Sequence, residues 1–371
     1  MSSRISPTRG PFGALAARLV HPPGRLALAT LPTPIERAAW LDGPGGEVWI
    51  KRDDRSSTVY GGGKVRKLEW VLANSPFSGE QPIVSVGGIG SHHLLALALF
   101  LAAQQRSLHA LTFVTTPTAH IRRNLAAMVS LGVRFWPVKT RAGLPRALWN
   151  YYVAQRPPVR GVWMGAGAST ALGCFGFVEA ALELGEQIAA GLLPPPDRIF
   201  VAAGSAGTAA GLALGLALAE VPVELRLVSS VERWAFNDWL LGRKIREAWA
   251  LLRRCGCAGP GSPRRLLEGA GVKLVVDHAE VGGGYGVPTD AATREVVVAR
   301  EHGLALETTY TGKGVAAVRR WTARAGARPE RILFWNTHGS TDLGPIIRPG
   351  WEEACPFPVP PEVGDSDAPT G

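Results

Sequence analysis

One stretch of the sequence points most directly to a fold and a chemistry: Tyr60-Gly61-Gly62-Gly63-Lys64-Val65-Arg66-Lys67-Leu68-Glu69. A lysine directly follows three glycines and precedes a segment with helical character. Lysine is scarce in this chain, because arginine occupies almost every other position that carries a positive charge. Arginine cannot give up its proton in a protein, whereas a lysine amine can do so and then act as a base or nucleophile. Lys64 is therefore the first candidate for a catalytic residue.

Short apolar runs alternate with Ala- and Leu-rich segments on both sides of this stretch, a pattern typical of an α/β protein with parallel strands. Strands are predicted at residues 48–51, 83–86, 111–114, 133–138 and 198–202. Helices are predicted from about Val65, near Ser91, from about Ile121, over 177–190, and after Thr208 as far as Glu220. A chain of 371 residues with this pattern is expected to form two domains.

The composition argues against several classes of protein. The formal net charge is +10, but the arginines are scattered singly or in pairs and no nucleic-acid-binding module accompanies them, so a solvated basic surface is the preferred explanation. The four cysteines form no C-x-x-C pair, which indicates neither a metal site nor a disulfide framework. No apolar run is long enough to span a membrane.

The two ends of the chain differ in composition from the rest. Residues 1–30 are basic and contain no acid, a bias shared by mitochondrial transit peptides and by ordinary basic N-termini. They lack the apolar core of a secretory signal, so a cytoplasmic location is expected, with a mitochondrial one as the alternative. Residues 350–371 are rich in proline and acid. The first segment is predicted to be flexible and the second to be disordered.

A second glycine-containing turn follows the strand predicted at 198–202: Ala203-Gly204-Ser205-Ala206-Gly207-Thr208. A strand, a turn of small residues and a helix together place backbone N–H groups and a helix dipole where they can hold a phosphate. A dinucleotide fingerprint is disfavoured by Ala206 and Ala209, which stand where glycines are required. A P-loop is disfavoured because Val65 follows the lysine and Thr58 replaces the first glycine.

The same turn is one residue from the G-x-S-x-G motif of serine hydrolases. Ser205 would be the nucleophile, and Asp277, Asp342 and His338 follow later in the chain. A glycine-rich helix start that serves only tight packing is a further alternative. A lysine after one glycine turn combined with a phosphate loop favours pyridoxal phosphate, because its aldehyde reacts with a lysine amine and its phosphate needs N–H donors.

These residues resemble the 1-aminocyclopropane-1-carboxylate deaminase and D-cysteine desulfhydrase family. The resemblance runs from about residue 30 to 345 and is carried by a set of segments in the family's order: 31–35, 51–54, 61–69, 85–93, 283–288 and 309–313. It implies a fold-type-II α/β enzyme of the tryptophan synthase β-subunit type, with two parallel-rich open sheets. Residues 31–66 and 171–345 would form a large pyridoxal-phosphate-binding domain, and residues 67–170 a small inserted domain. A homodimer would be expected.

The resemblance also implies roles for individual residues. Lys64 would bind the cofactor covalently and move the Cα proton, and Ser91, at a helix N-terminus, would contact the substrate carboxylate or hydroxyl. Tyr285 and Tyr310 match two tyrosines near the ring and the substrate. The expected cofactor contacts are Lys64, His92, Gly204, Ser205, Ala206, Gly207, Thr208 and Thr311.

Three departures from the family pattern bear on the reaction. Gly63 and His92 stand where the family usually has asparagine, and Thr311 stands where the deaminases have a glutamate against the pyridine nitrogen. A neutral hydroxyl leaves that nitrogen largely unprotonated and the ring a weaker electron sink. Opening a cyclopropane requires the stronger sink, so the sequence favours β-elimination from a small amino acid such as D-cysteine, giving a 2-oxo acid and ammonia.

The alternatives are cyclopropane ring opening, a family member that binds the cofactor without catalysis, and the serine hydrolase. The degenerate member is suggested by Gly63, by His92, and by the motif at 334–340, where His338 departs from the usual His-Thr-Gly-Gly.

Overall fold

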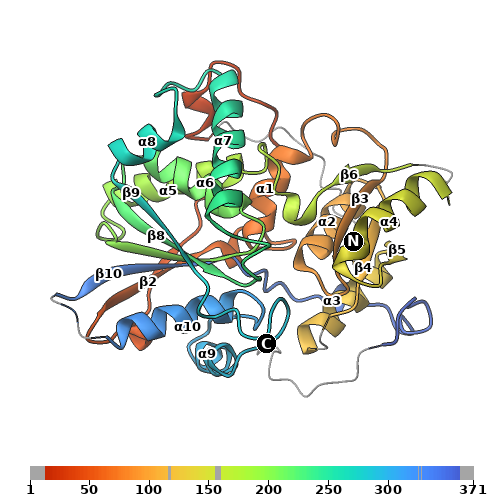
Figure 1. Cartoon of the computed structure of the whole chain (residues 1–371). Helices are drawn as coiled ribbons and strands as arrows, with labels where there is room; N and C mark the ends of the chain where they lie inside the picture. Colours follow the sequence, from red (N-terminus) through yellow and green to blue (C-terminus); the bar gives the residue numbers. More distant parts are fainter. Residues whose placement is uncertain (1–12, 116–117, 155–159, 325, 327, 360–371) are drawn as a thin grey trace.

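The computed structural model describes residues 13–115, 118–154, 160–324, 326 and 328–359. Two sheets lie side by side, each covered by helices (Figure 1). The strands are β1 Ile35–Arg37, β2 Gly46–Arg52, β3 Ile83–Gly88, β4 Leu108–Phe113, β5 Arg134–Pro137, β6 Val162–Met164, β7 Arg198–Ala203, β8 Val223–Ser229, β9 Val272–Asp277 and β10 Glu330–Asn336. The helices are α1 Gly63–Val71, α2 His92–Ala103, α3 Ala119–Ser130, α4 Leu144–Trp149, α5 Phe175–Ala189, α6 Gly207–Leu218, α7 Asp238–Arg254, α8 Pro263–Gly269, α9 Asp290–Glu301 and α10 Thr311–Thr322.

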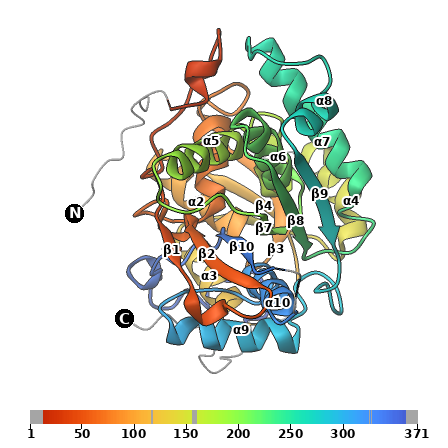
Figure 2. The same ribbon diagram turned by 90° about the vertical axis from the view of Figure 1, so that its left-hand side faces the viewer.

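The larger sheet has six strands in the order β1-β2-β10-β7-β8-β9. All neighbours pair in parallel except β1, which runs antiparallel to β2 at the edge. Helices α5 and α6 cover one face, and α9 and α10 cover the other (Figure 2). Because both faces are buried, the central strand β7 is apolar along nearly its whole length, as expected for a parallel sheet.

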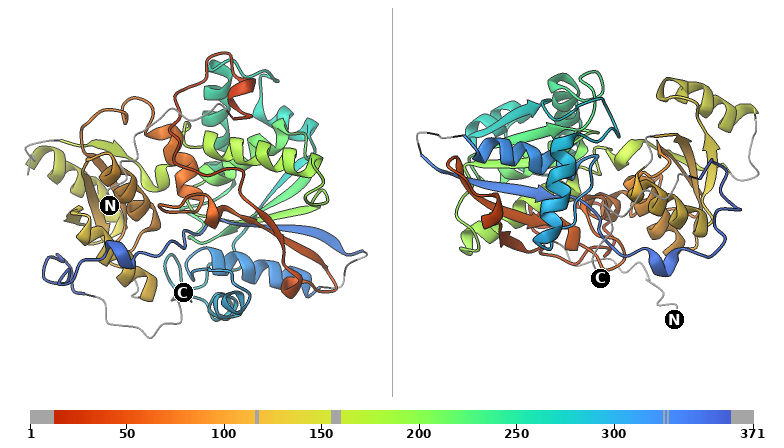
Figure 3. Two further views of the ribbon diagram at one scale, coloured as in Figure 1. Left: turned by 180° about the vertical axis from the view of Figure 1, so that it is seen from behind. Right: turned by 90° about the horizontal axis from the view of Figure 1, so that it is seen from below.

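The smaller sheet has four parallel strands in the order β5-β4-β3-β6, and all four lie between residues 83 and 164. Helix α2 packs on one side of this sheet, and its apolar residues form a separate core with α1. The view from below in Figure 3 shows the two sheets and their helices as neighbouring bodies. The α/β fold class and the parallel arrangement predicted from the sequence are therefore confirmed.

The predicted strands and helices occur where the sequence placed them, with ends that differ by a few residues. Parts of both terminal segments lie among the described residues. Leu15 and Leu19 are buried in the core of the large sheet, and Trp351 and Phe357 pack against α3. The flexibility predicted for residues 1–30 and the disorder predicted for residues 350–371 stay predictions. Residues 1–12 and 360–371 lie outside the described residues. Within the described part of the chain, no helix has the length and apolar character of a membrane span.

Helix α1, which carries Lys64, is fixed by a buried ion network. Arg66 donates two hydrogen bonds to the carboxylate of Asp53, at 2.9 and 2.7 Å, and further ones to Glu183 on α5. Lys51 on β2 also donates to Glu183. Such pairs are stable in a protein interior only when their hydrogen bonds are satisfied, as they are here. The network ties α1 to both β2 and α5 and so sets the position of the lysine.

Candidate active site

A cavity of about 590 Å³ opens between the two sheets. Its walls include residues at the carboxyl ends of β3, β4 and β7 and in the loop after β10. Ligands of open parallel sheets bind at the carboxyl ends of the strands. Every predicted site residue except Gly207 lines this cavity: Lys64, Ser91, His92, Gly204, Ser205, Ala206, Thr208, Tyr285, Tyr310 and Thr311.

Lys64 is the second residue of α1 and projects into the cavity wall. Burial lowers the pKa of its amine below the ordinary lysine value, and the negative charge of Glu307 offsets this only in part. The preceding turn needs glycine, because Gly62 has φ of +98° and a Cβ at Gly63 would lie 2.7 Å from Cζ of Phe177. Phe177 therefore packs directly against the backbone at position 63.

The predicted phosphate loop connects β7 to α6. Ala206 adopts a left-handed conformation with φ of 60°, and no side chain caps the N-terminus of α6. A helix of this length carries unsatisfied N–H groups and a positive dipole end in its first turn. Gly207, which does not line the cavity, packs instead against Ser169, where a Cβ would lie 2.6 Å from Oγ. The loop thus presents an anion-binding helix end to the cavity that Lys64 lines.

A second lysine lies behind this loop. Oγ of Ser205 is 2.7 Å from Oγ of Ser169, which accepts a hydrogen bond of 3.2 Å from Nζ of Lys67. Burial, reinforced by the charge of Lys64, lowers the pKa of Lys67 to about 7. The sequence analysis did not assign Lys67 a role, although its spacing of three residues from Lys64 on one helix was a usable signal.

The two predicted tyrosines face each other across the cavity wall. The rings of Tyr285 and Tyr310 meet edge to face with centroids 6.0 Å apart, and Phe113 at the end of β4 meets Tyr285 in the same manner. A Cβ at Gly204 would lie 3.1 Å from the Tyr310 ring, so the phosphate loop and this tyrosine are in close contact. Ser91 begins α2, and its hydroxyl accepts the N–H of Leu94 as a helix cap.

Glu307, a buried acid that was not predicted from the sequence, lies in hydrogen-bond contact with Thr311. The Glu307 carboxylate is buried and accepts backbone N–H groups of Thr309, Tyr310 and Thr311 at 2.7, 2.8 and 2.9 Å. The Thr311 hydroxyl in turn accepts the N–H of Glu307 at 3.1 Å. Burial alone would raise the pKa of Glu307, but His120, His338 and these N–H groups lower it. The signal in the sequence was an acid placed four residues before a helix start.

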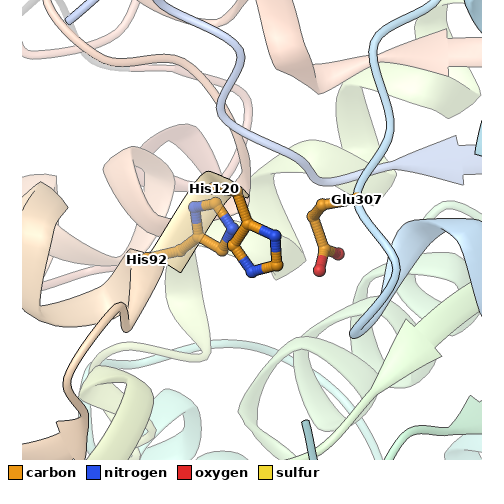
Figure 4. A group of neighbouring side chains, drawn as sticks. All are labelled: His92, His120 and Glu307. Carbon is orange, nitrogen blue, oxygen red and sulfur yellow. The ribbon is translucent and has the colours of Figure 1, made fainter. Parts of the chain in front are cut away.

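His92 belongs to a group of three histidines. Its ring lies 5.4 Å from that of His120 in a stacked arrangement and 5.0 Å from that of His338, edge to face. Nδ1 of His92 is 2.7 Å from the hydroxyl of Tyr60 and 3.3 Å from the amide nitrogen of Asn124. Burial, and then the neighbouring histidines, lower the pKa of His92. Figure 4 shows His92, His120 and Glu307 together at this end of the site.

In the described part of the chain, the side chains that a serine hydrolase would need as a catalytic triad do not contact one another. The hydroxyl of Ser205 is bound to Ser169. Asp277 is paired with Arg226 and Arg320, and Asp342 accepts the N–H of Gly344. The ring of His338 meets that of His92 edge to face, with centroids 5.0 Å apart. These side chains do not form a triad.

The arrangement fits pyridoxal phosphate on three counts. A buried amine, an uncapped helix N-terminus for a phosphate and an aromatic wall all border one cavity. The residues that would hold the group are Lys64 for its aldehyde and the Gly204–Thr208 loop for its phosphate.

Comparison with known proteins agrees with this geometry. The profile of the family described as "Pyridoxal-phosphate dependent enzyme" matches residues 26–338. The chain is 33% identical to a D-cysteine desulfhydrase of Salmonella paratyphi A, over 86% of this chain and 95% of the relative. It is 31% identical to a nocardicin C-9' epimerase of Nocardia uniformis, over 91% and 97%.

Solved structures lead to the same group. The structure of an ACC deaminase homologue superimposes with a TM-score of 0.69 at 26% identity, over 88% of this chain and 93% of that chain. A threonine deaminase isoform of Solanum lycopersicum shares the fold with a TM-score of 0.55 at 14% identity, over 95% of this chain and 92% of that chain. The chain belongs to the family of pyridoxal-phosphate-dependent enzymes, in the group of D-cysteine desulfhydrase and 1-aminocyclopropane-1-carboxylate deaminase, and is a lyase or deaminase that uses this cofactor.

Proposed function

We propose that this enzyme catalyses β-elimination from a small amino acid of the D-cysteine type and releases a 2-oxo acid and ammonia. The observation that carries the proposal is the buried amine of Lys64, which borders the same cavity as the uncapped N-terminus of α6. The 33% identity to a D-cysteine desulfhydrase over most of both chains supports the substrate class.

Each site residue has a role that its surroundings support. Bound pyridoxal phosphate supplies the electron sink that makes the Cα proton of an amino acid acidic. Lys64, whose pKa is lowered by burial, accepts that proton as a neutral amine. The start of α2 at Ser91 attracts the substrate carboxylate through its N–H groups. Tyr285 and Tyr310 form the aromatic wall beside the reacting carbon.

The choice of elimination over cyclopropane ring opening rests on Thr311. Its hydroxyl is neutral and is held by the backbone of Glu307, while the Glu307 carboxylate is engaged by three N–H groups. A neutral hydroxyl beside the pyridine nitrogen favours reactions in which the leaving group takes the electrons. Cyclopropane ring opening is the alternative reaction. Assays with D-cysteine and with 1-aminocyclopropane-1-carboxylate distinguish elimination from ring opening.

The test combines a variant with a substrate screen. Lys64→Ala is expected to lose both the visible absorbance of the lysine-bound cofactor and all 2-oxo acid release, whereas Lys139→Ala, at an exposed position, retains both. The wild-type enzyme is then given D-cysteine, L-cysteine, D-serine and 1-aminocyclopropane-1-carboxylate. Unchanged absorbance in Lys64→Ala would overturn the cofactor assignment. A yellow wild type that attacks none of the substrates would establish the degenerate family member.

A second candidate function is epimerisation at Cα. It is favoured by the 31% identity to an epimerase over 91% of this chain. Removal and return of the Cα proton requires no β-leaving group. Chiral chromatography of the recovered amino acid separates this outcome from elimination.

The proposal also covers the oligomeric state, the location, the partners and the domain bounds of the enzyme. We infer that the enzyme works as a homodimer in the cytoplasm and binds neither nucleic acid nor membranes. Residues 67–170 form the small domain, and residues 31–66 with 171–345 the large one. Light scattering of the purified enzyme measures the oligomeric state directly.

A further inference from the structure

Three possible metal ligands converge at the inner end of the cavity, and we call them the His–His–Glu cluster: His92, His120 and Glu307. They come from the start of α2, the start of α3 and the segment before α10. Their donor atoms lie within 4.8 Å of one another, and the two rings and the carboxylate are seen side by side in Figure 4. Two imidazoles and a carboxylate form a donor set that zinc and other divalent transition metals bind.

The histidines are oriented by neighbours in the manner of metal ligands. Nε2 of His92 is buried and has no hydrogen-bond partner among the described residues, while Nδ1 lies 2.7 Å from the Tyr60 hydroxyl. The amide nitrogen of Asn124 lies 3.3 Å from the same Nδ1, a longer contact than that with the Tyr60 hydroxyl. Nδ1 of His120 lies 2.9 Å from the hydroxyl of Thr118. When Nδ1 donates to an oxygen, the lone pair stands on Nε2 and points to the metal.

The carboxylate of Glu307 can bind a cation in addition to its present hydrogen bonds. Its Oε1 accepts the N–H groups of Tyr310 and Thr311 and the hydroxyl of Thr311, whereas among the described residues its Oε2 accepts the N–H of Thr309. A carboxylate oxygen has two lone pairs, so Oε2 can bind a metal without losing its helix cap. The residue is also buried, which distinguishes it from the acids found in exposed clusters.

We propose that the His–His–Glu cluster binds a divalent transition metal of the Zn²⁺ class beside the cofactor cavity. Tetrahedral Zn²⁺ with bonds of about 2.0–2.2 Å holds its ligand atoms roughly 3.3–3.6 Å apart, so ring rotation brings the donors together on binding. Three protein ligands leave a position open. The ring of His338 is 5.0 Å from that of His92, and all three members of the cluster line the cavity. The inference does not depend on which amino acid is the substrate.

The proposal departs from the expectation from the sequence that no metal is bound. That expectation rested on cysteine spacing, which carries no information about histidines on different helices. Two of the histidines around the site, His92 and His338, are also positions where the sequence departs from the family pattern. Nε2 of His92 can bind a metal or donate a hydrogen bond to the cofactor, but it cannot do both.

The test is metal binding by the cofactor-loaded enzyme. Purified enzyme is dialysed against a chelator, returned to buffer and titrated with Zn²⁺ by calorimetry, and metal content is measured after gel filtration. Wild type is expected to retain one Zn²⁺ per chain. His92→Asn and His120→Asn are expected to bind it more than about 100-fold more weakly, a larger loss than a change outside the ligands causes. Co²⁺ is expected to give ligand-field absorption at wavelengths longer than the cofactor band in wild type and not in His92→Asn or His120→Asn.

His302→Asn is the matched control, because His302 stacks on Trp40 away from the cluster and its loss leaves Zn²⁺ binding unchanged. His92→Asn introduces the residue that is usual in the family, and circular dichroism reports whether each variant is folded. Three outcomes overturn the proposal: no Zn²⁺ retained by wild type, equal Zn²⁺ binding by His120→Asn and wild type, or a changed cofactor spectrum in His92→Asn with unchanged Zn²⁺ affinity. The Zn²⁺ readout stands even if the proposed elimination reaction fails.

Discussion

At the scale of single residues, the buried amine of Lys67 is expected to gain a proton and to strengthen cofactor binding when the phosphate is bound. In the structure its pKa is lowered to about 7, so near pH 8 the amine is mostly neutral. A doubly negative phosphate bound at the Gly204–Thr208 loop would act on it through Ser169 and Ser205 and raise the pKa again. Binding of pyridoxal phosphate at pH 8 is therefore expected to draw a proton onto Lys67. Calorimetry in buffers of different ionisation enthalpy counts that proton.

The variant Lys67→Met isolates this contribution. It is expected to take up fewer protons than wild type and to bind the cofactor about 10- to 100-fold more weakly, the range expected for one hydrogen bond to a charged group. Equal proton uptake by the two proteins would show that Lys67 does not respond to the phosphate.

The residues that the sequence identified and those that it missed differ in a simple way. Lys64 was singled out by its position directly after three glycines, whereas Ser91, Tyr285 and Tyr310 were named through the resemblance of their short motifs to the family. His120 approaches His92 only because α3 packs beside α2, a tertiary contact that no local pattern encodes.

At the scale of elements, the position of α1 depends on close packing against α5. A Cβ at Gly176 would lie 2.0 Å from the carbonyl oxygen of Arg66 and 2.4 Å from its carbon, so the two helices meet backbone to backbone. Gly176→Ala is expected to lower the free energy of unfolding by about 1–3 kcal/mol, the cost of overpacking, and to lower kcat because α1 carries Lys64. Urea denaturation and steady-state kinetics measure the two effects.

Gly269→Ala provides the matched control for this prediction. Gly269 ends α8, and a Cβ there meets nothing within 4 Å. The substitution is expected to leave stability unchanged or slightly higher, because alanine favours a helix more than glycine does. A loss of unfolding free energy equal to that of Gly176→Ala would show that the effect at Gly176 does not come from its close packing against α1.

The elements also show how far the sequence pattern reaches. Strands β3, β4 and β7 are apolar runs buried on both sides, and the sequence predicted them. The edge strand β1 is three residues long, and β8 alternates apolar with charged residues in Val223–Ser229. A segment as short as β1 pairs because of its neighbours in the sheet, and its own sequence does not distinguish it from a loop. The alternation in β8 is a strand signal that the sequence-based prediction did not use.

At the scale of the whole molecule, one buried network joins distant parts of the chain. The carboxylate of Glu183 on α5 accepts hydrogen bonds from Arg66 on α1, Lys51 on β2 and the backbone of Thr33. Asp53 connects the same arginine to Trp335 on β10. The family motif at 51–54 is therefore explained structurally, because it supplies the charges that lock the large sheet to the helix of the catalytic lysine.

Removing the shared acid of this network is expected to weaken the entire fold. Glu183→Gln leaves Arg66 and Lys51 with an uncompensated buried charge, which costs about 3–5 kcal/mol of unfolding free energy near pH 7. The exposed pair Arg264–Glu268 offers the control, and Glu268→Gln is expected to cause no measurable loss. Urea denaturation of the three proteins at pH 7 measures these differences.

The pH dependence of the stability difference between wild type and Glu183→Gln shows whether the charge of Glu183 causes that difference. Burial alone would raise the pKa of Glu183, but Arg66 and Lys51 lower it from 4.5 to about 2 in the folded protein. Between these values the unfolded chain binds a proton that the folded chain does not, so the contribution of Glu183 is complete above about pH 4.5 and falls as the pH decreases towards 2. The stability difference between wild type and Glu183→Gln is therefore expected to stay constant from pH 7 to 5 and to narrow at lower pH. A difference that persists unchanged at pH 3 would mean that the substitution acts through packing and not through the ion network.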